Sequence, residues 1–372
     1  MDSPLNTHVY AIIMAGGPVK ALWPAARKSR PVHCLDFFHQ GALITHIINC
    51  IESTVASDRT FVITSKEGRE CLLKNGTSIR PRNIIAEPIA RNTAICIALA
   101  TAYIKKIDPD AITIVLPCDH HIGDLAKFRE VIQAGITVAA EKNGLVTIGV
   151  NPEYAETDYG YIQADEQLPV GLSGDPANGF SLFRVKTFAE KPDYATAVQF
   201  LESKDFFWNS GIFIWHIEAV WQELERSMPD LFKDLLVMYE HIGTPDEGAV
   251  IEDIYSWVHP VSIDYGIMEK ADSVFMIAAD FGWTDLVNWD EVAKVAAGIE
   301  GAEEACELDV LRMESPGVFL RKPQGKAVCL IGVSNLIVID TGDALLICSK
   351  GESCRVSGAI DQFRRENREE LL

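Results

Sequence analysis

The stretch VYAIIMAGG at residues 9–17 decides how this chain of 372 residues is expected to fold. Residues 9–14 form a short, apolar, β-prone run, and Gly16 and Gly17 follow it closely. Such a run predicts a buried strand that leads into a tight loop. Backbone N–H groups in a glycine loop at the carboxyl end of a strand can bind phosphate oxygens, but two glycines in this place also suit an ordinary tight turn.

Strands and helices are expected to alternate along the first 150 residues. The sequence predicts further strands at residues 60–64, 112–116 and 145–150, and helices at residues 42–51, 92–105 and 128–142. This alternation indicates an α/β fold in which a Rossmann-like, mostly parallel mixed sheet is covered by helices on both faces. Ligands of such sheets bind at the carboxyl ends of the strands.

The middle of the chain is expected to continue the sheet on the substrate side. Strands are predicted at residues 159–165, 183–188 and 210–216, helices at residues 193–203 and 217–226, and a turn-rich connection at residues 169–179. The alternation therefore loosens after residue 151 and then resumes.

The pattern of predicted elements changes after about residue 292. Short apolar strands separated by Gly or Asp turns are predicted at residues 327–333, 336–340 and 344–348. We therefore expect two domains, a large one at residues 1–292 and a small β domain at residues 293–372. Residues 359–372 predict a terminal helix that docks on a neighbouring element or on a second subunit, as in a homodimer.

The formal net charge of −20 excludes broad attraction to nucleic acid or to anionic membranes. A local exception lies between Asp2 and Asp36, where no other acidic residue occurs. The basic residues of this stretch are Lys20, Arg27, Lys28 and Arg30. They suit either a solvated loop or a local site for a small anionic ligand.

Cysteine usage and apolar runs indicate a reducing compartment. The nine cysteines include no CxxC pair, which favours reduced thiols over a disulfide framework or a zinc site. No signal peptide is recognisable, and no apolar stretch reaches the roughly 18 residues that span a bilayer. The expected location is therefore the cytoplasm, without a membrane partner.

Two aspartates are candidate ligands of Mg²⁺, which prefers carboxylate, phosphate and water oxygens. Asp119 follows the predicted strand 112–116, and Asp285 lies in the aromatic stretch GWTDLVNW at residues 282–289. Asp285 also suits a turn cap between two packed tryptophans. The adjacent His120 and His121 lack zinc-ligand spacing, and one of them is expected to support the loop.

A series of motifs in constant order along nearly the whole chain resembles the mannose-1-phosphate guanylyltransferases, also called GDP-mannose pyrophosphorylases. The motifs are AGG with LWP at residues 15–24, EP with RNTA at residues 87–94, LP with DH at residues 116–120, YGYI at residues 159–162, FAEKP at residues 188–192, WNSG at residues 208–211, SIDYGIMEK at residues 262–270, and Trp283 with Asp285. The order of these pieces is what makes the resemblance specific.

This resemblance implies a fold, a reaction and a set of site residues. The fold would be the nucleotidyltransferase fold followed by a short left-handed β-helix-like domain. The reaction would transfer GMP from GTP to mannose 1-phosphate with Mg²⁺, releasing pyrophosphate and GDP-mannose. The implied nucleotide-binding residues are Gly16, Gly17, Glu87, Arg91, Asn92, Thr93 and Asp119. The implied sugar-phosphate residues are Gly160, Glu190, Lys191 and Asn209, and the metal ligands would be Asp119 and Asp285.

The sequence departs from the family at the phosphate loop. After the two glycines the family shows a small residue, Gly, Thr and then Arg before Leu-Trp-Pro, whereas this chain has Ala21 in place of the Arg. A later signature lysine is replaced by Val32. Both losses remove a phosphate-binding cation and predict less efficient catalysis. Lys20 is the hypothesised substitute, so the expected catalytic residues are Lys20, Asp119, Lys191 and Asp285.

Two alternatives stay open at this point. One is a catalytically impaired paralogue that binds a nucleotide sugar and serves as a regulatory or scaffold subunit. The other is a transferase that uses a different nucleotide or sugar, because base choice depends on loop geometry that a single sequence does not fix.

Overall fold

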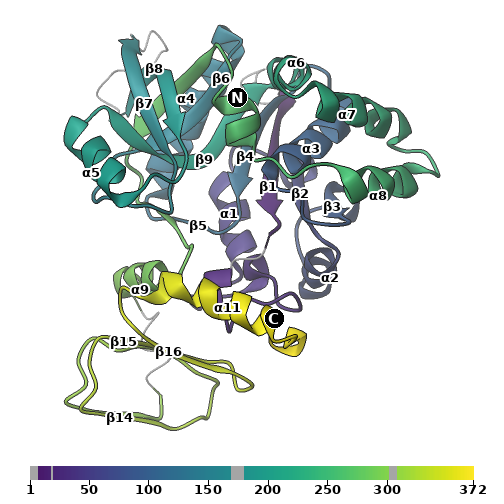
Figure 1. The fold of residues 1–372 in the computed structure, drawn as a ribbon. Helices are drawn as coiled ribbons and strands as arrows, with labels where there is room; N and C mark the ends of the chain where they lie inside the picture. The colour runs from purple at the N-terminus through teal and green to yellow at the C-terminus, as the bar shows by residue number, and fades with distance from the viewer. Residues whose placement is uncertain (1–6, 18–19, 169–179, 301–307) are drawn as a thin grey trace.

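The computed structural model describes residues 7–17, 20–168, 180–300 and 308–372. A large α/β part holds a central sheet with helices packed around it, and a smaller part of short strands extends from one end (Figure 1). Helix α11 (Val356–Arg365) lies where the two parts meet (Figure 1). The turn-rich connection expected at residues 169–179 lies outside the described residues.

The central sheet has nine strands in the order β3-β2-β1-β4-β9-β6-β10-β8-β7. The strands are β1 (Val9–Ala15), β2 (Thr60–Ser65), β3 (Ile84–Glu87), β4 (Ile112–Pro117), β6 (Leu145–Val150), β7 (Tyr161–Leu168), β8 (Phe180–Ala189), β9 (Phe206–His216) and β10 (Val274–Ala279). Neighbouring strands are parallel except at β7, β8 and β9. The expected mostly parallel mixed sheet is therefore confirmed.

Strand β1 shows why the sheet is covered on both faces. Val9, Ala11 and Ile13 belong to one buried cluster, which also contains residues of α1 (Leu43–Ile51) and α4 (Leu125–Lys142). Tyr10 and Ile12 belong to the opposite cluster. The helices of that face are α3 (Thr93–Ile107), α6 (Ile217–Ser227), α7 (Pro229–His241) and α8 (Glu247–Trp257). Successive side chains of a strand point to opposite faces, so a strand buried on both sides is apolar throughout.

Most predicted elements agree with the structure to within a few residues. Elements of the large part that were not expected from the sequence include α2 (Lys66–Asn75), α7, α8 and the strands β3 and β10. Another unexpected feature is a two-stranded sheet in which β11 (Trp283–Asp285) pairs antiparallel with β5 (His120–Ile122). This small sheet ties together two segments that are far apart in the sequence.

The smaller part is built from paired short strands. In it β12 (Val310–Met313) pairs parallel with β14 (Val328–Ile331), and β13 (Phe319–Arg321) pairs parallel with β15 (Leu336–Asp340). Strand β16 (Leu345–Ser349) returns antiparallel to β15. The first two pairs join strands about 18 residues apart, so the chain comes back to the same side once per turn. This is the arrangement expected of a short β-helix.

Helix α9 (Trp289–Gly298) packs against both parts. Trp289 and Val292 share one buried cluster with Phe319 and Ile337 of the smaller part and with Leu22 of the phosphate loop. The domain boundary expected after residue 292 remains a prediction, because residues from both sides of it pack in this one cluster.

Cys34 and Cys71 form a disulfide in the structure, so the expectation of reduced thiols was wrong for this pair. Cys34 ends the short helix η3 (Val32–Cys34) and Cys71 lies in α2. The two residues are 37 positions apart, and only the packing of η3 on α2 brings them together. The other cysteines of the described residues are free. Within the same residues, no helix is both long and apolar enough to cross a membrane.

Candidate active site

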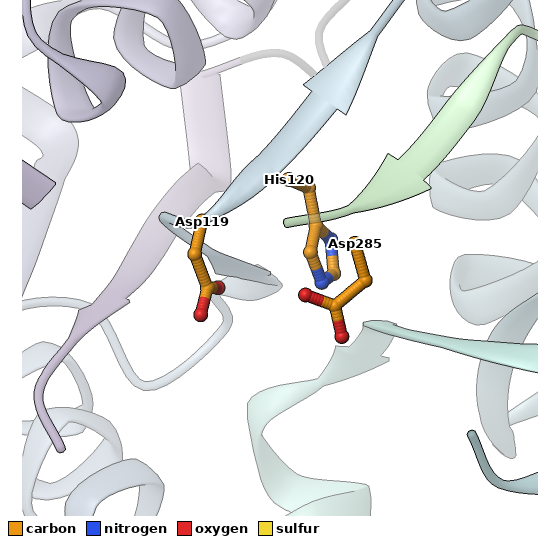
Figure 2. Close-up of side chains that lie close together, drawn as sticks. All are labelled: Asp119, His120 and Asp285. Atoms are coloured by element: carbon orange, nitrogen blue, oxygen red, sulfur yellow. The ribbon is translucent and has the colours of Figure 1, made fainter. Parts of the chain in front are cut away.

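The paired strands β5 and β11 bring Asp119 and Asp285 together. Asp119 lies between the end of β4 and the start of β5, and Asp285 ends β11 directly opposite His120. The backbone N–H of Leu286 donates to the carbonyl oxygen of Asp119 over 3.1 Å, which fixes the two segments side by side. Ligand atoms of Asp119, His120 and Asp285 all lie within 4.8 Å of one another (Figure 2).

The electrostatics of this aspartate pair favour a bound cation. Burial raises the pKa of Asp119, and burial together with the charge of Asp119 raises the pKa of Asp285 well above its ordinary value. Oδ1 of Asp285 is buried and has no hydrogen-bond partner among the described residues. Two close carboxylates with an unpartnered oxygen suit a hard divalent cation such as Mg²⁺, and a cation would lower both pKa values.

His120 lies beside the aspartate pair and packs against Trp283. The indole Nε1–H of Trp283 donates to Nδ1 of His120 over 3.1 Å, and burial lowers the pKa of His120 to about 3. A neutral ring whose Nδ1 accepts a hydrogen bond carries its proton on Nε2. In this tautomer the Nδ1 lone pair is taken by Trp283, and the support of the loop by one of the two histidines stays a prediction.

A cavity of about 540 Å³ opens beside the glycine loop. Gly16, Gly17, Lys20 and Glu87 are among the residues that line it. The cavity therefore lies over the carboxyl ends of β1, β2 and β3, next to the β4 end that carries Asp119. Its place agrees with the rule that ligands of such sheets bind at the strand ends.

Glu87 is buried at the wall of this cavity. The Tyr255 hydroxyl donates to Oε1 of Glu87 over 3.0 Å, and burial raises the pKa of the Glu87 carboxyl to about 7. A Cβ on Gly16 would lie only 3.2 Å from Oε2 of Glu87. Gly16 is thus needed for the close approach of the loop to this carboxyl group. Tyr255 was not singled out from the sequence.

Arg91, Asn92 and Thr93 hold neighbouring elements together and are not among the residues that line the cavity. The Arg91 guanidinium donates to the carbonyl oxygens of Tyr255 and Ser256 at 2.9 and 2.8 Å. Asn92 caps α3 with a φ of 68°, and Oγ1 of Thr93 accepts from the N–H of Ile263 over 2.8 Å. The expected contact of these three residues with the nucleotide stays a prediction.

The altered positions of the phosphate loop are buried. Ala21 and Val32 are 8% and 4% exposed, and Val32 packs in the cluster that joins the two parts of the molecule. Lys20 lines the cavity, but its Nζ pairs with Oδ1 of Asp361 in α11 over 2.9 Å. The proposed replacement of the missing arginine by Lys20 therefore stays a prediction, and it would require Lys20 to leave or share this ion pair.

A second polar cluster joins Gly160, Glu190, Asn209 and Asp264. The Asn209 N–H donates to the carbonyl oxygen of Gly160, and the Asn209 side chain donates to Oδ1 of Asp264, both over 2.8 Å. A Cβ on Gly160 would lie 2.7 Å from Oε2 of Glu190. Asp264 was part of a recognised motif but was not expected in the site.

Lys191 connects this cluster to the aspartate pair. Burial raises the pKa values of Glu190, Asp264 and Asp285, and the positive charge of Lys191 opposes the increase at all three. Lys191 therefore lies within electrostatic range of both the polar cluster and Asp285. A cation at this point can offset the charge of a sugar phosphate next to a metal ion.

Comparison with known proteins defines the family. The chain belongs to the nucleotidyl transferase family, whose model matches residues 10–301. Residues 309–362 match a MannoseP isomerase/GMP-like beta-helix domain, which confirms the expected β-helix-like character of the smaller part.

Individual relatives match over nearly the whole chain. A mannose-1-phosphate guanylyltransferase of Salmonella montevideo is 32% identical over 97% of this chain and 75% of its own length. An alginate biosynthesis protein of Pseudomonas fluorescens is 30% identical over 95% of this chain and 72% of its own. The crystal structure of a mannose-1-phosphate geranyltransferase from Thermus thermophilus is 26% identical, covers 96% of this chain and 99% of its own, and superimposes with a TM-score of 0.80.

Proposed function

We propose that this chain is a mannose-1-phosphate guanylyltransferase, which transfers GMP from GTP to mannose 1-phosphate and releases pyrophosphate. The observation that carries this proposal is the half-buried Asp119–Asp285 pair at the carboxyl end of β4, with Lys191 within electrostatic range of Asp285. The names of the relatives support the choice of guanosine and mannose.

In this reaction an oxygen of the sugar phosphate attacks the α-phosphorus of GTP, and the bond between the α- and β-phosphates breaks. When bound by Asp119 and Asp285, Mg²⁺ would neutralise phosphate charge at the point where the two substrates meet. Lys191 would hold the sugar phosphate and offset its repulsion from the nucleotide. The backbone N–H groups of Gly16 and Gly17 would bind phosphate oxygens of GTP.

The sugar-binding and base-binding roles follow from the remaining groups. Glu190, Asn209 and the backbone at Gly160 would bind the hydroxyl groups of mannose, and Asp264 would orient the Asn209 amide. Glu87 would accept hydrogen bonds from the nucleotide at the wall of the cavity. Orientation of this kind is the main contribution that a protein makes to phosphoryl and nucleotidyl transfer.

The alternative of a silent regulatory or scaffold paralogue is not favoured, because the relatives that match nearly the whole chain are named as transferases or biosynthesis proteins. The replacement of two signature cations by Ala21 and Val32 concerns the efficiency of the reaction. Cytoplasmic location, a homodimer and the absence of a nucleic-acid or membrane partner stay predictions from the sequence.

The test is a pyrophosphate-release assay with a panel of nucleoside triphosphates and several hexose 1-phosphates in the presence of Mg²⁺. We expect the highest rate with GTP and mannose 1-phosphate, and no rate above the enzyme-free control after chelation of the metal. Product identity is checked by mass spectrometry of GDP-mannose. Equal rates for all nucleotides, or no pyrophosphate from any pair, would contradict the proposal.

A further inference from the structure

The C-terminal helix α11 forms one wall of the cavity beside the glycine loop. Ile360 and Arg364 of α11 line the same cavity as Gly16 and Gly17. In Figure 1 the helix crosses directly below the N-terminal segments of the large part. Residues far apart in the sequence, at the start and the end of the chain, therefore enclose one space.

Several contacts hold α11 and the following turn against the phosphate loop. The indole N–H of Trp23 donates to the carbonyl oxygen of Leu371 over 2.8 Å, and the rings of Trp23 and Phe363 lie 5.6 Å apart. Trp23 also belongs to a buried cluster with Val356 and Ile360. The helix is thus packed in place before any ligand enters, so its side chains are preorganised.

The family's phosphate loop lacks two cations in this chain, and of the loop cations that line the cavity Lys28 is exposed whereas Arg27 and Lys20 are held in ion pairs. Arg27 lines the cavity, but its side chain is 7% exposed and it pairs with Asp343. Lys20 is 33% exposed and pairs with Asp361. A triphosphate at the glycine loop carries more negative charge than Lys28 alone offsets, so a further accessible cation at the cavity wall would strengthen its binding.

Arg364 has the position and the chemistry for this role. Its side chain is 43% exposed, it lines the cavity, and its guanidinium lies 3.5 Å from Oδ1 of Asp361. The same oxygen accepts from Lys20 over 2.9 Å, so one carboxylate holds two cations together at the cavity wall. A guanidinium binds phosphate oxygens through paired N–H donors, which a lysine cannot do.

We propose that Arg364 of the C-terminal helix binds the polyphosphate chain of the nucleotide. It would take the role of the family's signature arginine, whose position is occupied by Ala21 in this chain. The identity of the nucleotide in this inference rests on the proposed function. Asp361 keeps Lys20 and Arg364 close to each other in the free protein. The phosphate oxygens then compete with the Asp361 carboxylate for the two cations.

The experiment measures binding of inorganic tripolyphosphate to the full chain by titration calorimetry at low salt. We expect Arg364→Gln to weaken binding about tenfold or more, because a charge-assisted hydrogen-bond pair is lost. Arg364→Lys should lose less affinity for tripolyphosphate than Arg364→Gln, since lysine keeps the positive charge. Asp361→Asn should bind more tightly than the unmodified protein, because it removes the anion that competes for Lys20 and Arg364.

The matched control is Arg365→Gln, which removes an equal charge from the next position of the same helix. Arg365 is not among the residues that line the cavity, and its substitution should leave the affinity within about twofold. Thermal unfolding of each variant shows whether α11 keeps its packing. If Arg364 only stabilised the helix, its substitution would lower the melting temperature, and Asp361→Asn would not tighten binding.

Two results would overturn the inference, namely no saturable binding of tripolyphosphate to the unmodified protein, or equal affinities for the Arg364→Gln and Arg365→Gln variants. Failure of the proposed function has a different signature. In that case tripolyphosphate binds and depends on Arg364, but GTP and mannose 1-phosphate yield no pyrophosphate.

Discussion

The hydroxyl group of Tyr255 donates a hydrogen bond to Oε1 of Glu87 over 3.0 Å. This contact joins α8 to the carboxyl end of β3 and holds a carboxyl group at the wall of the cavity beside the glycine loop. The hydrogen bond keeps Glu87 in one orientation, and the burial of its carboxyl group makes the stability of the protein depend on pH.

The pH dependence of unfolding should report the burial of Glu87. Its pKa is raised from 4.5 to about 7, so the folded protein keeps a proton that the unfolded chain releases. Stability from this group is present at low pH and falls as the pH rises from about 4.5 through 7. The side chain of Glu87→Gln is neutral at every pH. The free energy of unfolding of this variant, relative to the unmodified protein, should therefore rise by up to about 3 kcal/mol between pH 4.5 and about 8.

The measurement is urea unfolding of both proteins at several pH values, compared as the difference in free energy of unfolding. Other buried carboxyl groups contribute equally to both proteins and cancel in this difference. A difference that stays constant with pH would show that Glu87 ionises normally in the folded state.

Removal of one carboxylate from the aspartate pair should lower activity and raise stability in the absence of metal. Asp285→Asn removes a proposed metal ligand, so we expect pyrophosphate release to fall at least about 100-fold. It also removes a buried charge that faces Asp119, so the melting temperature without Mg²⁺ should rise.

Added Mg²⁺ should stabilise the unmodified protein but not Asp285→Asn, because binding of a ligand to the folded state alone raises the melting temperature. The control is Asp272→Asn, an aspartate whose side chain is 89% exposed at the surface. A variant that loses activity but melts lower than the unmodified protein would argue against mutual repulsion of Asp119 and Asp285.

Gly160→Ala should impair binding of the sugar phosphate more than binding of GTP. The new Cβ would lie 2.7 Å from Oε2 of Glu190, so the Glu190 side chain has to move out of its place. We expect KM for mannose 1-phosphate to rise about tenfold while KM for GTP changes little, because loss of a charged hydrogen-bond partner costs roughly 1.5 kcal/mol. Gly298→Ala, where a Cβ meets nothing within 4 Å, is the matched control.

The Cys34–Cys71 disulfide should make stability depend on reductant. Closing a loop between residues 37 positions apart stabilises a protein by about 3 to 4 kcal/mol in the chain-entropy model. Addition of reductant should therefore lower the melting temperature of the unmodified protein, whereas Cys71→Ser should melt at the same low temperature with and without reductant. Thiol titration of the unfolded, unreduced protein gives the number of paired cysteines directly.

The sequence was sufficient for strands such as β1, β4 and β6 because they are short apolar runs with glycine or proline next to an end. The run at residues 9–14 and the run at residues 112–116 correspond to β1 and β4 almost residue for residue. Asp119 and Asp285 could also be found, since each lies next to a recognisable motif. Their closeness could not be derived from spacing, because it depends on the pairing of β5 with β11.

The remaining parts of the site depend on tertiary contacts that leave no local pattern. Tyr255 lies in a helix whose amphipathic spacing resembles that of any surface helix. Arg364 belongs to a charged tail, and its place at the wall of the cavity that Gly17 also lines follows from the packing of Trp23 against α11. Cys34 and Cys71 show no motif, because the sequence does not indicate that η3 packs on α2.

Strand β9 is one continuous segment of 11 residues, and it pairs with β4 through residues 213–216 and with β6 and β7 through residues 206–214. Because β9 runs antiparallel to β4, with Ile112 opposite His216 and Val115 opposite Phe213, the carboxyl end of β4 that leads to Asp119 points toward the Asn209 end of β9. The hydrogen-bonded pairing of β4 with β9 therefore places Asp119 and Asn209 toward the same edge of the sheet. The relative placement of these two side chains is thus fixed by backbone pairing and does not depend on the loops around them.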